Sequence, residues 1–154
     1  MLAAVLSAIV GFPAELILPT FSARLVNELV VFVCQPNLDI GDDDWRTYVQ
    51  WLKELQRELP SLGILTAAGG RAPSSAQRSL LSRELQTDRI KVAVLLTDPK
   101  LVVIVKITSW FMKGAEAFKA HELEKALAYL GASDHARIRA TIRELGGIIH
   151  KAAP

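Results

Sequence analysis

The sequence has a single cysteine, little net charge and no apolar run long enough to cross a membrane. Cys34 alone cannot form an internal disulfide, and its place at the end of an apolar run indicates a buried thiol in a reducing compartment. The 18 basic and 16 acidic residues leave a net charge of +2 and are dispersed, which argues against nucleic-acid binding. Residues 1–11 are apolar, but they fall short of the roughly twenty residues that span a bilayer and lack the basic start of a signal peptide. We therefore expect a cytoplasmic protein with no transmembrane span.

Motifs for catalysis and for metal binding are also missing. Gly69 and Gly70 fit neither a Walker loop nor G-x-G-x-x-G, and the nucleophile motif G-x-S-x-G does not occur. No two histidines have the H-x-x-x-H spacing of a zinc site; they are His121, His135 and His150. These absences predict a non-catalytic protein that carries no cofactor and no metal.

What the chain does contain is apolar periodicity, with 51% hydrophobic residues over the length of one domain. Residues 14–34 hold two β-branched runs separated by Asn27-Glu28, which predicts a hairpin, although its turn lacks the favoured Asn-Gly pair. Apolar residues at helical spacing follow over 45–59. Asp42, Asp43 and Asp44 stand at the start of that helix, where capping of its free N–H groups is favoured over metal binding.

Strands and helices alternate through the rest of the sequence. We predict strands over 62–67, 90–96 and 115–119, and helices over 74–85, 121–131 and 133–145. The segment 99–112 is rich in β-branched residues, which favours a strand, but Asp98-Pro99 is typical of a helix start and we predict a helix. The order predicts an α/β domain with a mainly parallel sheet, opened by a hairpin and covered by four to five helices.

The stretch "GGRAPSSAQRSLL" has a structural explanation at the start of the helix over 74–85. Ser74 followed by Gln77 is a capping box, in which each side chain bonds the backbone N–H of the other residue. The cap is worth about 1 kcal/mol.

The serines that open this helix directly after a sheet strand are also a feature shared with a known protein family. With the hairpin and the alternating elements, they resemble the STAS fold of sporulation anti-sigma-factor antagonists. Residues 91–131 resemble the branch grouped with Sec14-type lipid-binding domains, in the strand that runs into "TD" and the final "ELEKALAYLG". The resemblance implies a STAS-like domain over 14–131, preceded by an apolar segment 1–13 and followed by a C-terminal helix and tail 132–154.

In antagonists of this family, a serine at this helix start is phosphorylated by a partner kinase. Ser74 and Ser75 match that position and are the phospho-acceptors that the resemblance implies. Pro73 and Ala76 stand where the family has aspartate and glycine. Arg71 and Arg78 nearby could stabilise a phosphate, although basic residues beside a helix start are also common without that role.

Two functions follow from these patterns. The helix over 99–112 is apolar nearly all round, so its surplus faces another chain, as in a homodimer or a complex with a protein partner, or is covered by residues 1–12. The predicted interaction surface consists of Ile107, Trp110, Phe111 and Met112. We expect a protein-interaction module in bacterial signalling or assembly. The alternative is a domain that binds lipid or another small apolar ligand, which needs a cavity between this helix and the sheet.

Overall fold

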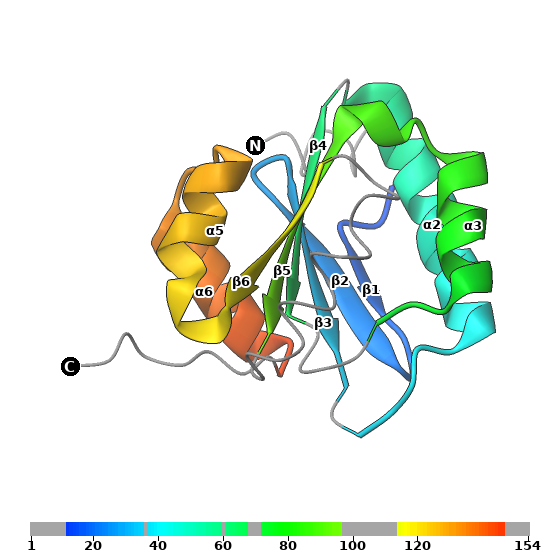
Figure 1. The fold of residues 1–154 in the computed structure, drawn as a ribbon, viewed down its shortest axis with the longest axis horizontal. Coiled ribbons are helices and arrows are strands. Elements are labelled where there is room, and N and C mark those ends of the chain that lie inside the picture. The colour runs from blue at the N-terminus through cyan, green and yellow to red at the C-terminus, as the bar shows by residue number, and fades with distance from the viewer. Residues whose placement is uncertain (1–11, 36, 60, 68–71, 97–113, 147–154) are drawn as a thin grey trace.

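The computed structural model describes residues 12–35, 37–59, 61–67, 72–96 and 114–146, and it confirms the α/β class. A six-stranded sheet lies between two pairs of helices (Figure 1). Its strands are β1 (Glu15–Ile17), β2 (Phe21–Val26), β3 (Leu29–Cys34), β4 (Leu62–Ala67), β5 (Ile90–Leu96) and β6 (Ala115–Lys119). Their order across the sheet is their order along the chain. The strands pair antiparallel from β1 to β3 and parallel from β3 to β6, so the mainly parallel sheet is as predicted.

Each face of the sheet carries two of the described α-helices. Helices α2 (Asp42–Glu58) and α3 (Ser75–Glu84) cover one face, and α5 (Leu123–Leu130) and α6 (His135–Glu144) cover the other (Figure 1). Two short 3₁₀ turns, η1 (Thr87–Arg89) and η3 (Ala120–Glu122), precede β5 and α5. Crossovers between parallel strands share one hand in nearly all proteins, and two successive crossovers that step the same way across the sheet put α2 and α3 on the same face. The helix predicted over 99–112 lies outside the described residues.

The hairpin predicted over 14–34 is confirmed for β2 and β3, which turn at Asn27 and Glu28. Its first arm is not one strand, however. Pro19 interrupts it, because proline has no N–H for a sheet ladder, and residues 15–17 fold back as β1 beside β2. With Pro13 before it and Pro19 after it, β1 is a short edge strand that neither end can extend.

The core has two chemically different halves, because neighbouring residues of a strand point to opposite faces. Aromatic rings fill the α2 side: the rings of Phe21 and Phe32 lie 4.5 Å apart, and Tyr48 lies 4.9 Å from Phe32. Phe12 stacks on Trp51 at 5.5 Å, and the indole Nε1 of Trp51 donates to the carbonyl of Pro13 at 2.7 Å. Aliphatic side chains fill the α5–α6 side; they include Val31, Val33, Leu65, Leu127, Ile138 and Ile142.

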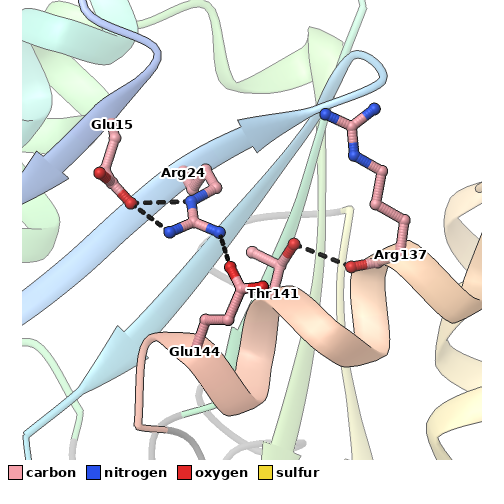
Figure 2. Close-up of polar contacts among 5 residues, drawn as sticks. All are labelled: Glu15, Arg24, Arg137, Thr141 and Glu144. Atoms are coloured by element: carbon pink, nitrogen blue, oxygen red, sulfur yellow. Dashed lines mark hydrogen bonds and ion pairs between the residues drawn. The ribbon is translucent and has the colours of Figure 1, made fainter.

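The last described helix is tied back to the first strands by Arg24. Its guanidinium, on β2, donates to Glu15 of β1 at 2.5 Å and to Glu144 of α6 (Figure 2). The hydrogen bond to Glu144 and the contacts with Glu15 raise the pKa of Arg24. Residues near the two ends of the described chain are therefore joined across the edge of the sheet.

Two helix boundaries bear on the sequence predictions. Gly131 ends α5 with a φ of 65°, as predicted for a glycine stop. The three aspartates form the first turn of α2, at the positive end of its dipole, as predicted, but the predicted side-chain cap is wrong, since Gly41 is the N-cap. Asp44 accepts instead from the N–H and the hydroxyl of Thr20, at 2.9 and 2.7 Å, and so joins the start of α2 to the β1–β2 connection. None of the helices in the described ranges has the length and apolarity needed to cross a membrane.

Candidate functional site

The amino end of α3 carries the capping box that the sequence predicts. Ser74 is the N-cap, and its Oγ accepts from the N–H of Gln77 at 3.1 Å. The Gln77 side chain completes the box, because its Oε1 accepts from the N–H of Ser74 at 2.9 Å. The backbone of the serine pair is thus fixed from both sides.

Gln77 does more than close the cap, and the sequence reasoning missed this. The side chain is buried, with 5% exposed, and its Nε2 donates to the carbonyl of Ile40 at 2.8 Å and to Asp42 Oδ1 at 2.9 Å. The indole Nε1 of Trp45 donates to the Gln77 carbonyl at 2.8 Å. Gln77 therefore fastens the start of α3 to the start of α2. Its spacing of four residues from the buried Leu81 was the available signal, since both lie on one face of the helix.

The two predicted phospho-acceptors differ in what their hydroxyls do. Both serines are exposed, but Ser74 Oγ is used by the cap. Ser75 is the first residue of α3, and its Oγ lies 3.1 Å from Nη2 of Arg78. Arg78 is itself held by the carbonyl of Pro73, which accepts from Nη1 at 2.7 Å. Of the two hydroxyls, that of Ser75 is the one beside a positioned guanidinium.

A phosphate on Ser75 would meet favourable electrostatics. The first turn of a helix has free N–H groups and partial positive charge, and α3 has no acidic residue in its first turn. A phosphoserine adds about −1.5 to −2 charges at neutral pH. Arg78 could therefore bind the phosphate oxygens from its present position, a few ångströms away.

Other predicted residues are placed as follows. Cys34 is buried at the end of β3, as expected, and lies near the phenol of Tyr48, whose pKa is raised by burial. Within the described ranges, no three His, Cys, Asp or Glu side chains come together as a metal site would require. The predicted interaction surface of Ile107, Trp110, Phe111 and Met112 lies outside the described residues.

Comparison with known proteins gives no family assignment. A scan against protein-family models, a search of curated proteins and a search of solved structures each returned no match for this chain.

Proposed function

We propose that this chain is a non-catalytic protein-interaction module with a STAS-like fold, used in bacterial cytoplasmic signalling or assembly and modified by phosphorylation at Ser75. The observation that carries the proposal is the exposed Ser75 hydroxyl, 3.1 Å from the guanidinium of Arg78 at the start of α3. The hairpin followed by strand–helix units, with serines at the helix that follows β4, supports the STAS-like assignment.

The surroundings of Ser75 suit a switch that acts on a partner rather than on the fold. Ser74 and Gln77 hold the first turn of α3, and Gln77 is anchored to Ile40 and Asp42 of the neighbouring segment. A phosphate at Ser75 would leave these bonds in place and would change the charge of the surface above them. A partner that docks on this surface would then be released or recruited by charge alone.

Self-association is the second element of the proposal. The apolar side chains of Ile107, Trp110, Phe111 and Met112 are the predicted contact between copies of the chain. Replacing Trp110 and Phe111 by serine should weaken a homodimer, measured by light scattering during size exclusion, while the circular dichroism of the fold is retained. A wild-type chain that stays strictly monomeric at high concentration would contradict the self-association part of the proposal.

Phosphorylation is tested by mapping phosphopeptides of the chain purified from its own cells. We expect the phosphate on Ser75, and its loss in Ser75→Ala but not in Ser79→Ala, which changes another exposed serine of the same helix. Arg78→Gln should reduce binding of a phosphate-dependent partner without lowering the helix content. An unmodified Ser75 in cells that phosphorylate other proteins would contradict the proposal.

The alternative, a domain for lipid or another small apolar ligand, needs a cavity against the segment 99–112. Native mass spectrometry of the freshly purified chain separates the two functions. Bound lipid on a monomer favours the alternative, and a ligand-free dimer favours the interaction module.

A further inference from the structure

A second feature lies at the amino ends of the parallel strands, the opposite end from Ser75. A pocket of about 370 Å³ opens there, and Leu29, Leu62 and Ile90 at the amino ends of β3, β4 and β5 form its apolar floor. Its walls are the turn between β2 and β3 and the loop between α5 and α6. The volume is at the small end of the roughly 300–1,000 Å³ of ligand pockets, so it suits a small molecule.

Charged side chains of both signs line this pocket without pairing to one another. Glu28 and Asp88 are the acids, and Arg89 and Lys91 are the bases. Within the part of the chain that the structure describes, the side chains of Glu28, Asp88 and Arg89 make no hydrogen bond or ion pair. The Lys91 ammonium donates to the carbonyl of Tyr129 at 3.5 Å, near the carboxyl end of α5, and lies 5.2 Å from the centre of the Tyr129 ring. The lining thus offers separate positions for a negative and a positive group of one ligand.

Glu28 is also the residue with the least structural reason for its conformation. It has a φ of 68° at the second position of a two-residue hairpin turn, where glycine is strongly preferred. Asp134 has a similar φ of 54°, but its carboxylate caps α6 by accepting from the N–H of Arg137. Glu28 has no such bond to offset its strain. The turn sets this φ, so what the fold leaves unexplained is a glutamate in place of glycine, and a residue kept at such a cost is a candidate for binding.

We propose that this pocket binds a small zwitterion of the amino-acid type, with its ammonium group toward Glu28 and its carboxylate toward Arg89. The opposed charges of the lining disfavour a ligand of single charge, since one pair of side chains would repel it.

The test is an NMR titration of the complete chain with the common free L-amino acids, one at a time, and with acetate and methylammonium as single-charge probes. We expect at least one amino acid to shift the amide signals of residues 27–29, 88–91 and 131–133 in a saturable way, with both single-charge probes at least roughly tenfold weaker. Glu28→Gly should abolish the binding, and because glycine relieves the positive φ, the variant should remain folded and unfold at a higher temperature. Glu58→Gln, an exposed acid on α2, is the matched control and should bind like wild type.

Three results would overturn the proposal. They are the absence of shifts with every amino acid at about 10 mM, which is weaker than any useful affinity; unchanged binding in Glu28→Gly; and acetate or methylammonium binding as tightly as the best amino acid.

Discussion

Polar side chains are arranged in opposite ways at the two ends of the parallel strands, here called the carboxyl edge and the amino edge of the sheet. At the carboxyl edge, around the start of α3, Gln77 is buried and both ends of its amide are bonded to neighbouring segments. At the amino edge, Glu28, Asp88 and Arg89 are exposed, and the described part of the chain gives their side chains no bond. The first arrangement fixes a surface, and the second leaves hydrogen-bonding capacity for a ligand.

This contrast separates stability from binding. A buried polar group is costly to leave unpaired, whereas an exposed one is solvated by water and its removal costs the fold little. Substitution of the buried Gln77 at the carboxyl edge should therefore act mainly on the free energy of unfolding, unlike substitution of the exposed Ser75 beside it. Substitutions at the amino edge should act mainly on binding.

The largest effect is expected for Gln77→Ala. It leaves the N–H of Ser74, the carbonyl of Ile40 and a carboxylate oxygen of Asp42 without their partner, and should lower the free energy of unfolding by about 2–3 kcal/mol. Urea denaturation measures the change. Gln56→Ala is the control, because that amide also bonds backbone groups, those of Gln86, but at an exposed position. Equal losses in the two variants would show that burial is not what distinguishes the carboxyl edge.

The next largest effect is the difference in stability between substitutions of the two serines. Ser74→Ala removes the cap acceptor and should lower the free energy of unfolding by about 1 kcal/mol. Ser75→Ala removes only an exposed contact with Arg78 and should change it by less than about 0.5 kcal/mol. Denaturation midpoints of the two variants, compared side by side, check the difference. A larger loss of stability for Ser75→Ala than for Ser74→Ala would show that Ser75, and not Ser74, has the structural role.

At the amino edge two residues with positive φ should respond in opposite directions. Glu28→Gly relieves a left-handed glutamate and should raise the free energy of unfolding by about 0.5 kcal/mol. Gly131→Ala places a Cβ at a φ of 65° and should lower it by about 1 kcal/mol, although nothing lies within 4 Å of that Cβ. Thermal melts of both variants measure these changes. Destabilisation by Glu28→Gly would mean that the carboxylate supports the turn after all.

The smallest effect is a dependence on pH at the α5–α6 loop, one wall of the pocket. His135 Nδ1 lies 2.6 Å from Glu124 Oε2, and its Nε2 lies 3.0 Å from the carbonyl of Ala132. Both partners are acceptors, so the doubly protonated ring fits best, and the hydrogen bond to Glu124 raises the pKa of His135 above its ordinary 6.5.

Because the pKa is raised in the folded chain, the stability from His135 is fully present below pH 6.5 and is lost as the pH rises through the folded pKa. His135→Gln should therefore lower the melting temperature more at about pH 5.5 than at about pH 8.5. A difference between wild type and variant that does not change with pH would exclude the imidazolium as its cause.

Much of the fold could be predicted from local sequence, for reasons seen in single elements. Continuous apolar runs identified β4 and β5, and the S-x-x-Q pattern identified the start of α3. The prediction was wrong where a distant partner decides. Asp44 stands where a capping residue is common, but Thr20 competes for its carboxylate, and that contact spans 24 residues.

The candidate sites were predictable to different degrees. The serine pair could be found because a cap is a local pattern. The anchoring of Gln77 to Ile40 and the pocket at the amino edge could not, since each brings together segments that only the folded sheet makes neighbours. The missing glycine at Asn27-Glu28 was visible in the sequence, but its meaning depended on which side chains the turn faces.

The match between strand order and chain order has a consequence for how the protein forms. Each strand can pair with the one made just before it, so the sheet can grow in chain order during synthesis. Short turns join β1 to β3, whereas each parallel pairing from β3 to β6 must wait for a longer connection and should form more slowly. The exception to chain order is α6, which must return to the first strands through the contact of Arg24 with Glu144, 120 residues apart. We expect the docking of α6 to come last in folding. Until α6 docks, the face of the first strands that it covers stays exposed.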